Sequence, residues 1–415
     1  MKQEAHWGTG EKVRQPSAGN QAGSGLAETC GISTPVFQAA MAGLSGPDLV
    51  AAVSNAGGLG HLGALRVLPK TLRGWIHRTR ELTDKPFGVN LVPQFGGPEF
   101  FNAALSVVLE ERPKVLSLFY GDFQDVIPRA RDAGIVTMVQ VGSLAEAEKA
   151  VTDGADILIA QGIDAGGHIR GRVGLMALLP AVAGIAGDRP VIAAGAINDV
   201  RAARAARCLG ASGVWCGTAF LASRECDAHD AYKEKLVKAN TDGPKFRTGY
   251  SYGWKLGTPH RSLDGRGGWN LLRFMGGGIR KADNPKMADK LSLYAGQGVG
   301  QIQSIRPAAE IVDELSRAFD VRPTVRAVSS APKKNEGQGY SDAALHCVSQ
   351  ECQVSTDMKA LIEKHGEELV AKAREVRHNG AMPILDETIL FEVSKELSAP
   401  ACTLLDLLPL ASNSK

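Results

Sequence analysis

The residues best placed to do chemistry lie between Ala160 and His168, a stretch that reads AQGIDAGGH. It follows ADILI at 155–159, a short apolar run typical of a fully buried parallel strand. Gly166 and Gly167 carry no side chains, so a flat ligand can lie close to the backbone there. His168 titrates near neutral pH and is therefore the candidate catalytic acid or base. A tight turn with a solvated histidine is the alternative for a GGH sequence on its own.

Alternating strand-like and helix-like segments must position this histidine. Short apolar runs predict eight strands, at 35–41, 58–64, 87–92, 114–119, 135–141, 155–161, 190–196 and 213–220. Helix-like segments separate them, at 46–56, 69–82, 98–111, 122–133, 143–153, 175–186 and 198–209, and another lies near 307–319. Ser143 followed by Glu146 is a capping-box pattern. This alternation predicts an α/β fold, a closed (β/α)₈ TIM barrel. An open doubly wound sheet is the alternative, because strand periodicity does not show closure.

A phosphate site is predicted after the seventh and eighth strands, where parallel barrels often carry one. Gly195 and Gly217 let backbone N–H groups approach an anion, and the Thr218 hydroxyl adds a donor. Asn198 or Asp199 is expected to cap the helix that follows. Either turn alone would be an ordinary connection, but together they indicate bound phosphate.

Small or uncharged residues end four more of the predicted strands: Ala39, Ala40 and Met41, then Asn90, Gln140 and Gln161. The small residues suit the edge or face of a planar ring, and an amide can make paired contacts with a heterocycle. For each amide taken singly, a satisfied strand-end side chain is the simpler interpretation. With a phosphate site on the same face, the set predicts flavin mononucleotide (FMN).

Eight segments together resemble the nitronate monooxygenase family, formerly called 2-nitropropane dioxygenases. They are QAAMAG, SNAGGLGHLGA, PFGVNL, VQVGS, AQGIDAGGH, IAAGAI, GTAF and YAGQGVG, in order from about Thr34 to Leu315. The resemblance implies a TIM barrel with non-covalent FMN and a catalytic histidine at His168. It places flavin contacts at Asn90, Gln161, Gly166, Ala196 and the turn of Trp215, Cys216, Gly217 and Thr218. The same superfamily includes FMN-dependent enoyl-acyl-carrier-protein reductases and NADH:quinone reductases.

The chain departs from the family pattern at three positions. Family members usually have Pro where this chain has Ala40, Gly where it has Ala196 and Glu where it has Asp164. The missing proline is expected to loosen the turn that faces the flavin. The methyl group of Ala196 narrows the approach to the phosphate, although a backbone contact there survives.

The resemblance leaves three functions open. The first is FMN-dependent oxidation of alkyl nitronates by O₂ to a carbonyl compound plus nitrite, extending to nitroalkanes if His168 removes their α-proton. The second is an NAD(P)H-dependent reductase of an enoyl thioester or quinone. The third is a catalytically silent flavin barrel whose tail binds another protein, which the intact His168 disfavours.

Composition limits the remaining possibilities. The 415 residues carry 47 basic and 44 acidic side chains, a net charge of +3, so we expect a small-molecule substrate, no nucleic acid and no membrane. Seven cysteines without a CxxC pair argue against a disulfide framework and a metal site, and no signal peptide is visible. A cytoplasmic enzyme is therefore expected.

The predicted organisation has four parts. They are a polar, disordered leader at 1–30, an FMN-binding barrel at 31–325 with a lid or insertion at 225–290, a linker at 326–342 and a C-terminal segment of unknown role at 343–415.

Overall fold

A computed structural model describes residues 24–94, 97–248, 254, 257–263, 279–281, 283 and 293–320. The chain divides into two units, residues 1–320 and 321–415, and the second lies outside the described residues. The predictions for 1–23, for the linker at 326–342 and for the segment 343–415 therefore concern residues that are not described.

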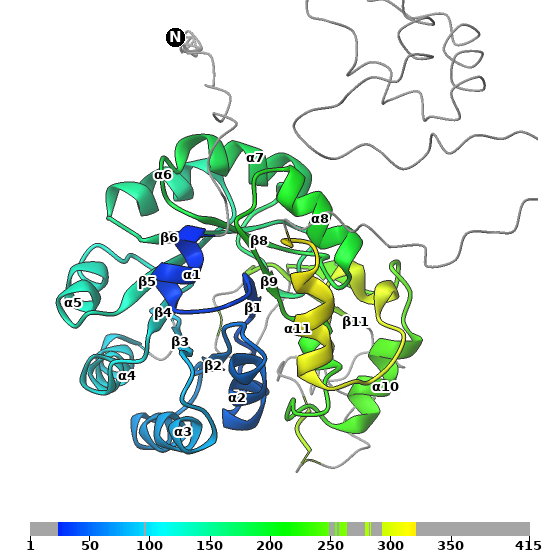
Figure 1. Ribbon diagram of the computed structural model, residues 1–415, viewed down its shortest axis with the longest axis horizontal. Coiled ribbons are helices and arrows are strands. Elements are labelled where there is room, and N and C mark those ends of the chain that lie inside the picture. Colours follow the sequence, from blue (N-terminus) through cyan, green and yellow to red (C-terminus); the bar gives the residue numbers. More distant parts are fainter. Residues whose placement is uncertain are drawn as a thin grey trace, which may run out of the picture. The chain divides into compact units, whose positions relative to one another are not determined.

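Eight parallel strands form one sheet in the order β1-β9-β8-β6-β5-β4-β3-β2 (Figure 1). Their bounds are β1 Val36–Gln38, β2 His61–Gly63, β3 Gly88–Leu91, β4 Val115–Leu118, β5 Val136–Val141, β6 Ile157–Gln161, β8 Val191–Ala194 and β9 Gly213–Cys216. The ring is completed by a parallel bridge between Phe37 and Leu59. There the Gln38 N–H donates to the Leu59 carbonyl at 3.0 Å. The predicted TIM barrel and all eight predicted strands are confirmed.

The strands are mostly apolar because both of their faces are covered. β6, for example, is buried at all five of its positions. One set of side chains fills the barrel interior, including Phe37, Met138, Ile159 and Trp215. The other set packs outward into a large apolar layer shared with the helices.

The helices form the outer ring of the barrel (Figure 1). Their bounds are α2 Pro47–Asn55, α3 Pro69–Leu82, α4 Gly97–Glu111, α5 Val126–Asp132, α6 Leu144–Thr152, α7 Leu175–Ile185, α8 Val200–Cys208, α9 Thr218–Leu221, α10 Asp230–Lys238 and α11 Ala308–Ser316. The predicted caps are present. The Ser143 hydroxyl accepts from the Glu146 N–H, and the Asp199 carboxylate accepts from the Ala202 N–H at 2.8 Å.

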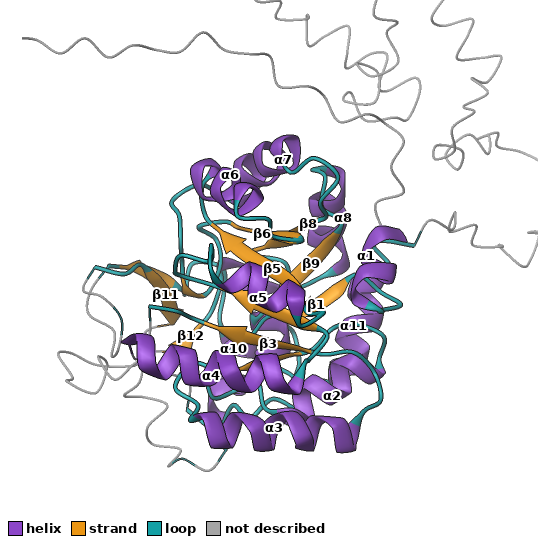
Figure 2. Cartoon of the chain, turned by 90° about the vertical axis from the view of Figure 1, so that its left-hand side faces the viewer, coloured by secondary structure: helices purple, strands orange, loops and turns teal. Residues whose placement is uncertain are grey.

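The leader prediction is wrong for its last seven residues. Ser24–Cys30 form helix α1, with Leu26 and Cys30 buried against the barrel-interior cluster of Phe37 and Trp215. Helix α1 lies at the opposite end of the barrel from strand β11 (Figure 2). Leu26 and Cys30, four residues apart, cover this end of the barrel interior. Two apolar residues are too few to reveal a helix in an otherwise polar stretch of sequence.

A second, small sheet lies at the other end of the barrel. It comprises β7 Gly167–His168, β10 Lys245–Arg247, β11 His260–Leu263 and β12 Leu293–Tyr294. β11 is at its centre and pairs antiparallel with β7, β10 and β12. Two strands of the predicted 225–290 insertion, β10 and β11, therefore belong to the same sheet as the histidine segment itself.

Candidate flavin and catalytic site

A cavity of about 830 Å³ opens at the C-terminal ends of the barrel strands. All of the residues predicted to bind the cofactor line it, and so does His168: Ala39, Ala40, Met41, Asn90, Gln140, Gln161, Gly166, Gly167, Gly195, Ala196, Trp215, Cys216, Gly217 and Thr218. They come from strand ends far apart in sequence, and barrel closure brings them together. The volume is typical of a small-molecule or cofactor site.

His168 is held in β7 by pairing with β11, opposite His260. Its ring stacks on the Trp254 indole with 3.8 Å between ring centroids, and the Tyr294 ring lies edge-on at 5.4 Å. Its Nε2 atom is buried and has no hydrogen-bond partner among the described residues. A reactive nitrogen is therefore held in a fixed, water-poor position without being committed to a structural bond.

The His168 imidazole is neutral near physiological pH. Burial, then the facing charges of His260 and Arg66, hold the pKa of His168 well below its usual value of 6.5. A neutral imidazole with an uncommitted nitrogen is suited to accept a proton.

Gln161 fastens the loop that carries His168. Its Nε2 donates to the His168 carbonyl at 3.0 Å, and its Oε1 accepts from the Arg170 N–H at 2.9 Å. Both polar atoms of the Gln161 side chain thus have protein partners, as the simpler interpretation of a satisfied amide at a strand end predicts. One amide proton is left to face the cavity.

Asn90 leaves more of its amide available than Gln161 does. Its Nδ2 donates to the carbonyl and hydroxyl of Ser117, both at 3.1 Å, so the amide is oriented and its oxygen is left to accept from a ligand. Gln140, at the end of β5, is half-buried on the same cavity wall.

The two glycines before His168 do different things. A β-carbon on Gly166 would meet the Gly296 nitrogen at 2.4 Å, so Gly166 makes room for another backbone segment. Gly167 has a φ of +70° and nothing within 4 Å of its β-carbon position. The prediction that both glycines make room for a flat ligand is therefore wrong for Gly166.

The turn after β1 is fastened by Ser45. The Ser45 hydroxyl accepts from the Met41 N–H at 2.8 Å and from the Gln38 side-chain nitrogen at 2.9 Å. Both Gln38 and Ser45 are fully buried. These bonds restrain the Ala39–Met41 turn, so the absence of proline at Ala40 does not leave it without fixed contacts.

The turns after β8 and β9 form the candidate phosphate cradle. Gly195 has a φ of +128° and Ala196 a φ of 53°, so Ala196 adopts the left-handed conformation that favours glycine. The Thr218 hydroxyl accepts from the Gly296 N–H at 3.1 Å, which leaves its own proton to donate. Burial raises the pKa of the Cys216 thiol, so Cys216 is no thiolate nucleophile.

These residues fit FMN. Next to the Thr218 hydroxyl and the left-handed turn, the wall carries oriented but uncharged amides, as a neutral planar heterocycle requires. The cavity's backbone turns and hydroxyl group would hold the phosphate, and Asn90 and Gln140 would hold the ring system.

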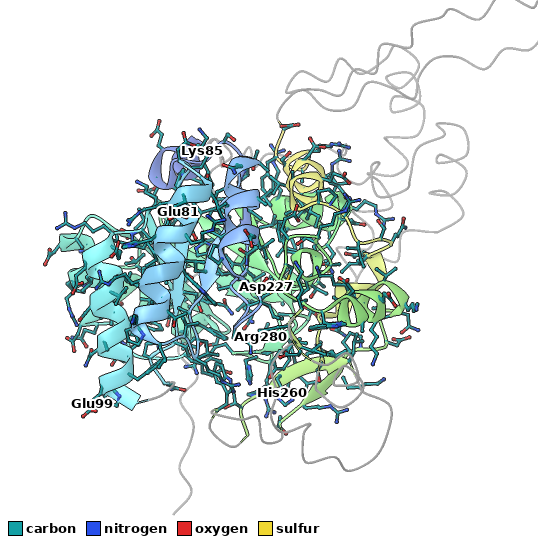
Figure 3. The ribbon with its side chains drawn as sticks, turned by 90° about the horizontal axis from the view of Figure 1, so that it is seen from below. Glu81, Lys85, Glu99, Asp227, His260 and Arg280 are labelled. Atoms are coloured by element: carbon teal, nitrogen blue, oxygen red, sulfur yellow. The ribbon has the colours of Figure 1, made fainter. Side chains whose placement is uncertain are left out.

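Several lining residues were not found from the sequence. Trp254 and Arg280 fall in the insertion, and Tyr294 in a motif to which no role was assigned. Figure 3 shows Arg280 and His260 toward the end of the barrel away from Glu81 and Lys85. No periodicity reveals such residues, because their position depends on how β11 and β12 return to the barrel.

Fold and site together define a flavin-dependent oxidoreductase built on a TIM barrel. The family model for nitronate monooxygenase matches residues 24–99 and 92–266, more than half of the sequence. This chain belongs to the nitronate monooxygenase family.

Individual relatives have several activities. The nitronate monooxygenase of Pseudomonas aeruginosa is 38% identical over 251 residues, which is 50% of this chain and 71% of that one. The (3aS,4S,5R,7aS)-5-hydroxy-7a-methyl-1-oxo-octahydro-1H-indene-4-carboxyl-CoA dehydrogenase of Mycobacterium tuberculosis is 37% identical over 240 residues, 57% of this chain. The match spans 65% of the dehydrogenase's own length.

Solved structures show the same spread of activities. FabK from Thermotoga maritima superposes with a TM-score of 0.61 at 33% identity, over 71% of this chain and 95% of FabK. The nitroalkane oxidase of Streptomyces ansochromogenes also gives 0.61, at 32% identity, over 71% of this chain and 99% of that one.

Two further observations concern the described residues only. Among them, no helix is long and apolar enough to cross a membrane. In the same residues, no group of three or more His, Cys, Asp or Glu side chains could hold a metal ion.

Proposed function

We propose that this protein binds FMN and uses O₂ to oxidise alkyl nitronates to a carbonyl compound plus nitrite, with His168 as the catalytic group. One observation carries the proposal. A neutral imidazole lines the cofactor cavity with its Nε2 uncommitted among the described residues. FMN, when bound, supplies the redox group between substrate and oxygen.

The protein's own residues position His168, accept the proton and exclude water. Gln161 and the β7–β11 pairing fix the His168 backbone, and Trp254 fixes the ring by stacking. From that position, His168 Nε2 accepts the α-proton of a neutral nitroalkane. With a preformed nitronate, which has already lost that proton, the neutral ring only positions the anion. The aromatic wall of Trp254 and Tyr294 limits water around the reacting carbon.

His168→Asn distinguishes the two roles. A lost general base removes a factor of about 10²–10⁴ in rate. We expect a loss of this size with nitroalkane and a smaller loss with preformed nitronate, while the flavin spectrum is kept. Equal losses on both substrates would make His168 an orienting group, and unchanged rates would remove it from the mechanism.

Cofactor identity is tested by denaturation. We expect the purified protein to be yellow and to release FMN, not FAD, because the turns after β8 and β9 offer one candidate phosphate cradle on the cavity wall. The GxGxxG spacing at Gly58, Gly60 and Gly63 runs into strand β2 rather than from a strand into a helix, so it is not a dinucleotide fingerprint. A colourless protein that cannot be reconstituted with FMN would contradict the proposal.

A second candidate is an NAD(P)H-dependent oxidoreductase of an acyl or enoyl thioester. It is favoured by the relative named as a carboxyl-CoA dehydrogenase and by two arginines, Arg66 and Arg280, on the cavity wall. Guanidinium groups suit the phosphates of such a substrate. Oxygen uptake driven by nitronate alone supports the first function, and NADH oxidation without oxygen supports the second.

A further inference from the structure

Two histidines face each other across the β7–β11 pair. His168 and His260 are direct partners in the antiparallel register, with 5.7 Å between their ring centroids and 43° between their planes. Directly opposed residues project to the same side of a sheet, so their side chains interact. His260 is only 5% exposed and, unlike His168, does not line the cavity.

The two rings share one enclosed compartment. The Tyr294 ring is edge-on to both, at 5.4 Å from His168 and 6.1 Å from His260, and Trp254 covers His168. Water is scarce there, so two positive charges would repel strongly. The enclosure disfavours a doubly protonated pair.

The charged groups around the pair are cationic. Arg66 faces His168, and Arg247 lies opposite His260 in the β10–β11 register. Arg261 turns away, donating to the carbonyls of Ile163 and Pro244, and the nearby Asp164 carboxylate acts on Arg261. Tyr294 is the titratable group contributed by β12. None of these groups stabilises a second proton on the two imidazoles.

The two imidazoles are not equivalent. Burial lowers the pKa of both, but a hydrogen bond to the Thr258 backbone favours the charged form of His260. Among the described residues, His168 Nε2 has no hydrogen-bond partner, and the charge of His260 lowers the pKa of His168 further. The first proton taken up by the pair therefore goes to His260.

We propose that His260 is a positioning residue for His168: the pair takes up one proton, His260 carries it, and His168 stays neutral and able to act as a base. The catalytic part rests on the proposed function, whereas the sharing of one proton does not. Mildly acidic conditions then charge His260 and leave His168 Nε2 free to accept a proton. The pH range over which the base works is thereby extended downward.

The test is a titration of the histidine rings by NMR in the flavin-loaded protein with isotope-labelled histidine. The two signals are assigned from His168→Asn and His260→Phe. In the wild type we expect His260 to protonate first and His168 only at lower pH. In His260→Phe, which keeps an aromatic ring but no charge, the His168 midpoint should rise by roughly one pH unit. The acidic limb of kcat/KM with nitroalkane should move upward by the same amount.

His77→Asn is the matched control, because His77 is an exposed histidine that pairs with Glu111 on the outer surface. It should leave the His168 midpoint and the pH profile unchanged. A loss of rate at every pH in His260→Phe, with the midpoint unmoved, would make His260 a purely structural residue and overturn the proposal. His260→Gln repeats the test with a smaller side chain.

The wild-type titration is an independent readout once the two signals are assigned, because simultaneous protonation of the two rings would overturn the proposal. A shifted midpoint in a protein that does not oxidise nitronates would refute the proposed function and leave the shared proton standing. Nitronate oxidation without a shift of the His168 midpoint would support the proposed function and overturn the shared proton.

Discussion

Gly166 lies so close to Gly296 that a β-carbon on Gly166 would meet the Gly296 nitrogen at 2.4 Å. The same Gly296 N–H donates to the Thr218 hydroxyl at 3.1 Å. One backbone segment therefore touches both the loop that carries His168 and the candidate phosphate turn. The proposed catalytic and cofactor-binding parts of the site are held in position relative to each other by this contact.

The contact predicts opposite outcomes for two neighbouring substitutions. Gly166→Ala should displace the 295–296 backbone, weaken FMN binding at least tenfold and lower the activity of any bound fraction. Gly167→Ala places a methyl group in open space and should cost only about 1 kcal/mol of backbone strain from its positive φ. Flavin titration and thermal unfolding measure both effects. Equal behaviour of the two variants would contradict the assigned roles.

A second prediction concerns Ser45, which does not line the cavity. Ser45→Ala removes the acceptor of the half-buried Met41 N–H and one of the two acceptors of the Gln38 side-chain nitrogen, at a cost of about 1–3 kcal/mol. Because these bonds fix the Ala39–Met41 turn, FMN affinity should fall along with stability. Calorimetry and flavin titration provide the two measurements.

The control for Ser45 is Ser316→Ala on helix α11. The Ser316 hydroxyl also makes a local bond, to the Asp313 carbonyl, but it is exposed and lies outside the cavity. Ser316→Ala should change neither stability nor FMN affinity appreciably. Unchanged flavin affinity in Ser45→Ala would mean that the turn is fixed by other contacts.

The barrel was predictable from the sequence because its strands are local signals. A run such as ILIA at 157–160 is buried on both faces, so it is apolar throughout and can be recognised from the local sequence alone. Residues at the strand ends followed from it, since barrel strands all point the same way. That is why His168, Asn90 and Thr218 were found.

The residues around His168 were not predictable in the same way. His260, Trp254 and Tyr294 reach the site only because β11 pairs with β7 and β12, and these pairings join segments about 90 or more residues from His168. Helix α1 was missed for a related reason. Leu26 and Cys30 pack against residues that come together only in the folded barrel, so the local sequence does not reveal that they are buried.

A third prediction follows from the left-handed conformation of Ala196. Its φ of 53° costs an alanine about 1 kcal/mol relative to glycine. Ala196→Gly should therefore keep or slightly raise stability, and it should tighten FMN binding by removing a methyl group from the phosphate approach. Ala133→Gly is the control, because Ala133 has a φ of −80° and gains nothing from glycine. Weaker flavin binding in Ala196→Gly would show that the methyl group contributes a contact.

The last prediction concerns His61, a fully buried histidine inside the barrel. Its ring lies edge-on to Trp215 at 4.6 Å, and neither ring nitrogen has a well-formed hydrogen bond among the described residues. Burial lowers its pKa from 6.5 to about 3, although the backbone groups of Leu59 and Gln38 favour the charged form. The folded protein therefore holds His61 neutral, whereas the unfolded chain protonates it below about pH 6.5.

The sign of the pH effect follows from linkage. Because the folded pKa is lowered, the unfolded state binds the extra proton, so stability is complete above about pH 6.5 and falls as the pH drops toward 3. This one group should contribute a slope of about 1.4 kcal/mol per pH unit in that range. His61→Leu removes the titrating group and places an apolar side chain among apolar neighbours, so stability near pH 7 should be kept. Denaturant unfolding between pH 4 and 7 should then show a flatter profile for His61→Leu than for the wild type. An equal slope in both proteins would mean that His61 is solvated or paired in the folded state.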